Sequence, residues 1–206
     1  YIPHSMPHIP LYVPDDVRDP DPKRAYINTI EHIDTEVGRL LKTIDDLKLT
    51  NNTYVIYTTD NGPWLPFLHH GGSAGPLRDG KGTTFEGGQR VPCVMRGPGI
   101  PAGTVCDELT GTIDLLPTIA AITGKPLPKG KKIDGLNVSG LWKGTEKNSP
   151  RTEFLHYTSR GDLEGIRSGK WKLLIKKPRR NPNNKPPEVF LFDLSKDLGE
   201  QNNLAE

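Results

Sequence analysis

Residues 23–63 most constrain the fold, because a long helical pattern is followed at once by a short strand pattern. Apolar residues recur at steps of three and four over residues 23–48, with charged residues between them, which predicts an amphipathic helix. Residues 53–58 are β-branched and aromatic, which predicts a buried strand, and residues 59–63 (Thr-Asp-Asn-Gly-Pro) give a turn signal. A helix beside a buried strand favours an α/β layer, in which the carboxyl end of the strand is the natural place for a ligand.

Composition narrows the class of protein. The 206 residues include 22 Gly and 20 Pro, which favours a loop-rich chain, and the glycines keep no three-residue period, which excludes a collagen-like chain. With 33% hydrophobic residues and a net charge of +2, wholesale disorder is not expected. No apolar run approaches the ~18 residues of a membrane span, and the near-balance of 27 basic and 25 acidic residues gives no global field for nucleic acid.

The later elements are shorter. Residues 63–88 contain seven glycines and are expected to lack regular structure. A second strand is predicted at 91–95 and a short helix at 109–123, capped by Thr112 or Asp114. The residue composition changes at about residue 125, so we expect an α/β domain at 1–125 and a linker with a small α+β subdomain at 126–206. That subdomain is predicted to hold an antiparallel sheet of four strands, at 153–157, 164–167, 171–175 and 189–192.

The basic run at 176–180 and the polar residues up to 187 are interpreted as a solvated hairpin loop. A nucleic-acid patch is the alternative, but the run lacks interleaved aromatic residues. We therefore predict no nucleic-acid partner and no membrane span.

Three places could carry chemistry. Asp60 and Asn61 offer hard oxygen ligands of the kind that suit Ca²⁺ or Mg²⁺, although the same residues also make a common turn. Lys81 stands between two glycines, where backbone can approach an anion, or where a lysine is simply solvated. His8 lies in Pro-His-Ile-Pro, an extended and stiff setting for a proton donor or for an ordinary loop histidine. The two cysteines are interpreted as small buried side chains.

Taken together, several strings resemble the type I sulfatase family, in particular its arylsulfatase A-like branch within the alkaline phosphatase superfamily. The most specific is Gly-Lys-Gly-Thr-Thr-Phe-Glu-Gly-Gly at 80–88. The others are Thr-Thr-Asp-Asn-Gly-Pro at 58–63, Pro-His-Ile-Pro at 7–10, Asp-Leu-Leu-Pro-Thr-Ile at 114–119 and Leu-Phe-Asp-Leu-Ser-Lys-Asp at 191–197. The resemblance implies the later part of an alkaline phosphatase-like sandwich, mainly parallel sheet flanked by helices.

The resemblance also implies roles for the candidate residues. Asp60 and Asn61 would be ligands of an active-site calcium, Lys81 would pair with a sulfate oxygen, and His8 would lie beside the bridging oxygen of the ester. A divalent cation, a lysine and an imidazole suit sulfate ester hydrolysis, because charge builds on the leaving oxygen as the S–O bond breaks. The implied substrate is a sulfated small molecule or a sulfated glycan.

The chain departs from the family at its nucleophile. The family uses a formylglycine made from a Cys or Ser in Cys/Ser-x-Pro/Ala-x-Arg, together with an early Asp-Asp pair that completes the calcium site. Residues 93–96 (Cys-Val-Met-Arg) do not fit that motif, and the acidic pair at 15–16 follows the His8 motif instead of preceding it. We therefore expect the carboxyl-terminal part of a sulfatase, inactive alone, whose partner is the N-terminal part of the same sulfatase.

Two alternatives stay open. One is a phosphate or phosphonate monoester hydrolase of the same superfamily, and the other is a noncatalytic binding fragment. By family, the compartment would be periplasmic, secreted or lysosomal; a signal peptide pattern is not present in this chain.

Overall fold

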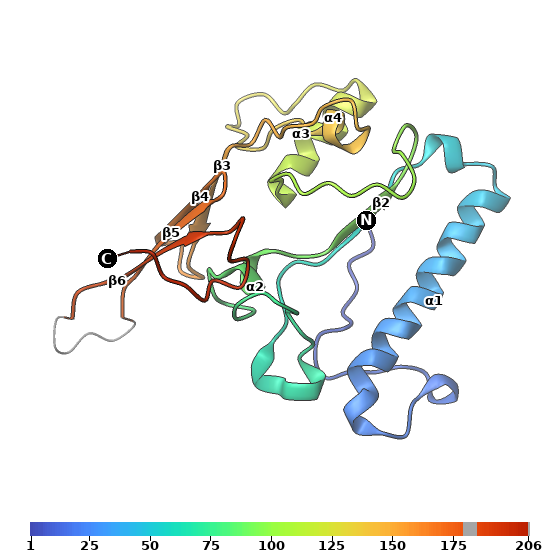
Figure 1. The fold of residues 1–206 in the computed structure, drawn as a ribbon. Coiled ribbons are helices and arrows are strands. Elements are labelled where there is room, and N and C mark those ends of the chain that lie inside the picture. The colour runs from blue at the N-terminus through green and yellow to red at the C-terminus, as the bar shows by residue number, and fades with distance from the viewer. Residues whose placement is uncertain (179–184, 206) are drawn as a thin grey trace. The chain divides into compact units, whose positions relative to one another are not determined.

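The computed structural model describes residues 1–178 and 185–205, and these form two compact units (Figure 1). The first unit contains residues 1–95 and 196–202, and the second contains residues 96–195 and the residues after 202. The boundary predicted near residue 125 falls inside the second unit, and the division into domains at that position stays a prediction. No helix in the described part of the chain is both long enough and apolar enough to cross a membrane.

The first unit is built from the predicted helix and two short strands. The helix α1 spans Ala25–Asp46, and the strands β1 (Val55–Thr58) and β2 (Cys93–Arg96) pair in a two-stranded sheet. Three short 3₁₀ turns flank the helix and precede the first strand: Asp15–Val17, Pro22–Arg24 and Thr50–Asn52. The side chain of Asp21 accepts the backbone N–H of Lys23 at 2.9 Å, which explains why the helical path begins there. The predicted helix and both strands are confirmed.

The loop at 63–88 is not without regular structure, contrary to the prediction. A 3₁₀ segment, η4, spans Leu65–His70, and a short helix, α2, spans Glu86–Gln89. The backbone N–H of Gly87 donates to the carbonyl of Arg78 at 2.8 Å, and a Cβ at Gly87 would overlap the carbonyl oxygen of Asp79. The glycines therefore allow close backbone approach, and hydrogen bonds inside the loop fix its path.

In the second unit, the predicted helix at 109–123 begins later than expected. A 3₁₀ turn at Thr112–Asp114 precedes α3 (Leu115–Thr123), and the helix ends at Gly124, whose φ of 64° is the left-handed conformation common at helix ends. Asp114, one of the two predicted caps, accepts the backbone N–H of Gly111 at 2.8 Å. A further short helix, α4, spans Ser139–Trp142.

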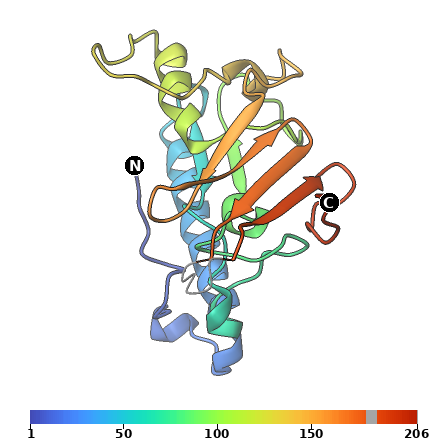
Figure 2. The same ribbon diagram turned by 90° about the vertical axis from the view of Figure 1, so that its left-hand side faces the viewer.

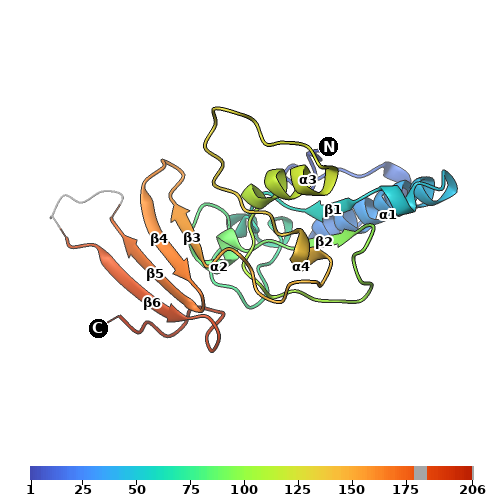
Figure 3. The ribbon, with the colours of Figure 1, turned by 90° about the horizontal axis from the view of Figure 1, so that it is seen from above.

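The four predicted strands form an antiparallel sheet in the order β3-β4-β5-β6, which Figures 2 and 3 show from two sides. They are β3 (Glu153–Tyr157), β4 (Leu163–Ser168), β5 (Trp171–Lys176) and β6 (Glu188–Asp193). Leu174 and Phe192 are fully buried and give the sheet its apolar centre. The predicted hairpin loop at 176–187 falls partly at 179–184, outside the described residues.

Little apolar surface is buried in the first unit. Among its described residues, Ile33 and Phe85 are the buried apolar side chains, while Val94 on β2 is 66% exposed. The solvent-accessible surface of the chain is 14430 Å². Two separate globular units of half its mass would expose about 11,500 Å² by the usual scaling of area with mass. The chain therefore leaves more surface in solvent than its size requires, whatever the placement of its two units.

Candidate active site

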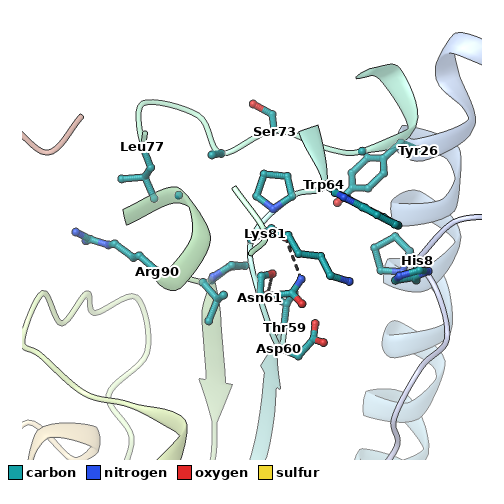
Figure 4. Close-up of a pocket in the computed structure, with 18 of the residues that line it drawn as sticks. His8, Tyr26, Thr59, Asp60, Asn61, Trp64, Ser73, Leu77, Lys81 and Arg90 are labelled. Carbon is teal, nitrogen blue, oxygen red and sulfur yellow. Dashed lines mark hydrogen bonds between the residues drawn. The ribbon is translucent and has the colours of Figure 1, made fainter. Parts of the chain in front are cut away.

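A pocket of about 380 Å³ lies in the first unit at the carboxyl end of β1 (Figure 4). It brings together the four residues that the sequence analysis selected: His8, Asp60, Asn61 and Lys81. They come from three separate segments, the amino-terminal loop, the end of β1 and the glycine-rich loop. The fold therefore places all four predicted site residues around one cavity.

Asp60 and Asn61 follow the last residues of β1. The Thr59 hydroxyl donates to the carbonyl of Asn61 at 3.1 Å, and the Asn61 Nδ2 donates to the carbonyl of Gly62 at 3.0 Å, so this turn is internally bonded. Because Nδ2 is occupied in this way, the Oδ1 of Asn61 is the atom that can serve as a ligand. The Asp60 side chain is exposed and contributes its carboxylate to the same pocket.

These oxygens suit a hard cation in kind but not in number. Calcium takes six to eight oxygen ligands, and the two residues supply at most a few of them. Within the described part of the chain, no cluster of three or more His, Cys, Asp or Glu side chains could hold a metal ion. The donor set therefore fits part of a calcium site, and Asp60 and Asn61 alone do not complete one.

Lys81 is held at the pocket by its backbone. Its N–H donates to the carbonyl of Pro63 at 2.8 Å, which joins the glycine-rich loop to the turn after β1. A Cβ at the neighbouring Gly80 would overlap the same carbonyl, so the close approach requires glycine there. In Figure 4 the Lys81 side chain extends toward His8, and its Nζ lies 5.2 Å from the ring centroid of Trp64.

A hydrogen bond to one ring nitrogen of His8 defines the role of each nitrogen. Its Nδ1 lies 2.7 Å from the carbonyl oxygen of Ile9, and because a carbonyl only accepts, this nitrogen carries the proton. The backbone N–H of His8 donates to the carbonyl of Ser5 at 3.1 Å, and its ring centroid lies 5.6 Å from that of Trp64. The other ring nitrogen, Nε2, is thus the one that could exchange a proton with a ligand.

Sequence reasoning missed several residues that line the same pocket: Tyr26, Trp64, His70, Leu77 and Arg90. Burial raises the pKa of Tyr26, and the nearby Tyr57 adds to the rise. Arg90 points away from Asp60 in Figure 4. The sequence signal that could have extended the predicted site was Trp64, an aromatic residue directly after the Asp-Asn-Gly-Pro turn.

Arg78 anchors the glycine-rich loop. Its Nη1 donates to the carbonyl of Glu200 at 2.8 Å, and its guanidinium lies 4.0 Å from the ring centroid of Phe85. It does not line the pocket. These contacts hold the loop in place, and Arg78 has no position from which to contact a ligand in the pocket.

The prediction that both cysteines are buried is wrong. Cys93 and Cys106 are free and exposed, because β2 lies on a lightly covered sheet and Cys106 lies in an irregular segment. Surrounding protein nevertheless raises the pKa of the Cys93 thiol by desolvation, so this residue is not an activated thiolate.

Comparison with known proteins shows which family the chain resembles. The family model described as Sulfatase matches residues 1–125. Human arylsulfatase A is 37% identical over 217 aligned positions, which cover 96% of this chain and 42% of that protein, and human steryl-sulfatase is 32% identical over 230, with 96% and 39% covered. The solved structure of Ps i-CgsB in complex with k-i-k-neocarrahexaose superposes with a TM-score of 0.77 at 28% identity, covering 97% of this chain and 44% of that one.

The chain belongs to the sulfatase family. The predicted fold class, an alkaline phosphatase-like α/β sandwich with a small carboxyl-terminal antiparallel sheet, is confirmed by the similarity of this chain to solved structures that include the PsFucS1 sulfatase from Pseudoalteromonas sp. (TM-score 0.79 at 24% identity, covering 96% of this chain and 42% of that one). The chain spans about two fifths of the length of the curated relatives it matches.

Proposed function

We propose that the complete protein hydrolyses sulfate monoesters in the pocket at the end of β1. The observation that carries this proposal is the convergence of His8, Lys81 and the oxygens of Asp60 and Asn61 on one cavity. In the reaction, the bond between sulfur and the bridging oxygen breaks, the alcohol leaves with a proton, and sulfur keeps an oxygen from water. The products are the free alcohol and sulfate.

Two of the residues act on the ester directly. The Lys81 ammonium pairs with a peripheral sulfate oxygen and holds the anion in place. His8 lies by the bridging oxygen, and its Nε2 donates a proton or hydrogen bond to the departing alcohol while Nδ1 stays bonded to Ile9. The His8 contact gains strength as negative charge moves onto the leaving oxygen, so it favours the transition state over the bound substrate. Lys81 holds and orients the sulfate group for that step.

Asp60 and Asn61 would hold calcium through their side-chain oxygens. When bound, the cation supplies positive charge to the sulfate oxygens. The support is the ligand type and the position of both residues at the strand end. We propose that the remaining ligands and the formylglycine nucleophile come from the N-terminal part of the same sulfatase, so that the 206-residue chain alone is inactive.

The exposed apolar surface of the first unit supports that partnership. Leu40 on α1, Leu47 directly after its end and Val94 on β2 are 45%, 63% and 66% exposed. The matched relatives are more than twice as long as the aligned part, which leaves room for a segment that covers such surfaces. Burying apolar surface is worth about 25 cal/mol per Å², so we propose that the N-terminal part packs on these side chains.

The proposed substrate is a sulfated small molecule or a sulfated glycan. The names of the relatives support both classes, since one is a steryl-sulfatase and one solved neighbour is in complex with k-i-k-neocarrahexaose. We propose that the complete protein acts outside the cytoplasm, in one of the compartments that the family implies: periplasmic, secreted or lysosomal.

The test is hydrolysis of a chromogenic aryl sulfate by the complete protein, with calcium and after its removal by a chelator. Lys81→Met and His8→Asn should each lower kcat/KM by about 100-fold or more, in the range typical of lost transition-state contacts and acid catalysis. Lys143→Met and His4→Asn are the matched controls, because these exposed residues do not line the pocket.

Three outcomes decide the matter. Calcium-dependent hydrolysis that is lost in the two pocket variants and kept in the controls supports the proposal. Hydrolysis of a phosphate ester but not of any sulfate ester contradicts it. Turnover by the 206-residue chain alone, at an intact mass near 22.8 kDa, contradicts the proposal that the nucleophile comes from elsewhere.

A further inference from the structure

Trp64 lines the pocket but has no role in the proposed reaction. It lies directly before η4, its side chain is 36% exposed, and it lines the cavity together with the four predicted site residues. In Figure 4 its ring lies between the Tyr26 side and the His8 side of the cavity. An exposed tryptophan inside a ligand pocket offers a large flat surface to whatever binds there.

The ring adjoins both groups proposed to touch the ester. The Lys81 Nζ lies 5.2 Å from its centroid, within the ~6 Å at which a cation is attracted to an aromatic face. The His8 ring centroid lies 5.6 Å away, with the two planes tilted by 44°. A sulfate group held by Lys81 and His8 would therefore have the Trp64 ring as its neighbour.

The ring is also held rigidly. The backbone N–H of Trp64 donates to the carbonyl of Gly71 at 2.9 Å, and its carbonyl accepts from Phe67 at 3.0 Å. Phe67 does not line the pocket, but its ring packs against Trp64 with centroids 4.5 Å apart. A surface fixed in advance loses little conformational freedom when a ligand binds to it.

The cavity has room for more than a sulfate group. Its volume of about 380 Å³ equals that of about a dozen water molecules at ~30 Å³ each. Apolar side chains share the lining with the charged groups, among them Pro7, Ile9 and Val91. The lining of the pocket thus combines charged groups, apolar side chains and one flat aromatic ring.

We propose that Trp64 is the wall on which the organic part of the substrate stacks, and that it selects esters in which the sulfated alcohol carries a ring. This inference rests on the proposed function and adds a substrate class to it. An aryl ring and the apolar face of a pyranose share the required chemistry, because each presents a flat C–H or π surface to the indole. An open-chain alkyl sulfate presents neither.

The experiment compares three substrates in the complete protein: phenyl sulfate, a pyranose monosulfate and hexyl sulfate. Trp64→Leu keeps an apolar side chain but removes the flat face, and Trp64→Phe restores a smaller flat face. Trp171→Leu is the matched control, because Trp171 is also exposed, at 42%, and also has a lysine over its ring, Lys170 at 4.7 Å, but lies outside the pocket.

We expect Trp64→Leu to raise KM about 10-fold for the cyclic esters, which corresponds to about 1.4 kcal/mol, and less than about 2-fold for hexyl sulfate. Inhibition by inorganic sulfate should not change, since that ion has no ring. Trp64→Phe should recover most of the loss, and Trp171→Leu should behave as the unaltered protein. The difference between phenyl and pyranose esters shows which ring the wall prefers.

Equal losses for all three esters and for inorganic sulfate would overturn the inference, because Trp64 would then only position Lys81 and His8. No loss for the cyclic esters would overturn it as well. Binding followed by tryptophan fluorescence separates this inference from the proposed function. If cyclic sulfates quench the fluorescence through Trp64 while no ester is hydrolysed, the stacking wall stands and the proposed hydrolysis fails.

Discussion

The Glu200 carboxylate accepts a hydrogen bond from the backbone N–H of Glu86 at 2.6 Å, across 114 residues of sequence. Glu200 is fully buried, and its own carbonyl accepts from Arg78 at 2.8 Å. A turn built on Asp197 holds it there, since that carboxylate accepts the backbone N–H groups of Gln201 and Asn202. The segment near the carboxyl end therefore braces both ends of the loop that presents Lys81.

Glu200→Ala should loosen that loop. The substitution leaves the buried N–H of Glu86 without its acceptor, which should lower the free energy of unfolding by about 1–3 kcal/mol. Hydrogen exchange measured by mass spectrometry should speed up about 10-fold or more in peptides covering residues 78–88, with α1 unchanged. Gln201→Ala is the control, because Gln201 is exposed and its side chain bonds only within the turn among the contacts described. Equal exchange in both variants would show that Glu200 does not brace the loop.

Gly87→Ala and Gly38→Ala should have opposite effects on stability. A Cβ at Gly87 would overlap the carbonyl oxygens of Arg78 and Asp79, and overpacking of this kind costs about 1–3 kcal/mol. A Cβ at Gly38, within α1, meets nothing within 4 Å, and alanine in a helix is favoured over glycine by about 1 kcal/mol. The midpoint of thermal unfolding should fall for the first variant and rise for the second. A rise for Gly87→Ala would mean that the loop is not packed as described.

Asp114→Asn should destabilise the second unit and make its free energy of unfolding depend less on pH in the acid range. Burial alone would raise the pKa of Asp114, but hydrogen bonds from Arg151, Leu136 and Gly111 outweigh it and lower that pKa below its usual value. A lowered folded-state pKa stabilises the protein above the unfolded-state value of about 3.9, and this stability is lost as pH falls through the folded-state pKa.

The loss at pH 7 should be about 3–5 kcal/mol, as for other buried pairs that lose one partner, because Arg151 is only 9% exposed. Urea unfolding between pH 2 and 7 measures it, and the difference between Asp114→Asn and the unaltered protein should shrink toward low pH. Lys132→Ala is the control, since its contact with Asp134 is 3.8 Å long and solvent-exposed. A pH-independent difference would assign the effect to packing alone.

The thiol of Cys93 should be alkylated more slowly than is usual for an exposed cysteine. Desolvation raises its pKa, so less thiolate is present near neutral pH in the folded protein than in the unfolded one. Labelling with iodoacetamide at pH 7.5, followed by peptide mass spectrometry, should be several-fold slower for Cys93 in the folded protein than in guanidinium. Faster labelling in the folded protein would contradict the direction of this shift.

Local patterns in the sequence were sufficient for most elements. The 3.6-residue periodicity predicted α1, and β-branched and aromatic runs predicted β1 and all four strands of the antiparallel sheet. Such patterns depend on neighbours close in sequence, which is why they can be interpreted without the fold. The identities of Asp60, Asn61, Lys81 and His8 as site candidates were equally readable, because their motifs are short and specific.

The tertiary structure decided what depends on distant contacts. Whether the glycine-rich loop is ordered depends on bonds such as that between Gly87 and Arg78 and on the buried Glu200, and no local pattern contains them. Trp64 became part of the pocket only when the segments with Lys81 and His8 were brought beside it. The sequence alone determined which side chains could do chemistry, and the folded chain determined which of them share a cavity, because that depends on contacts between segments far apart in the sequence.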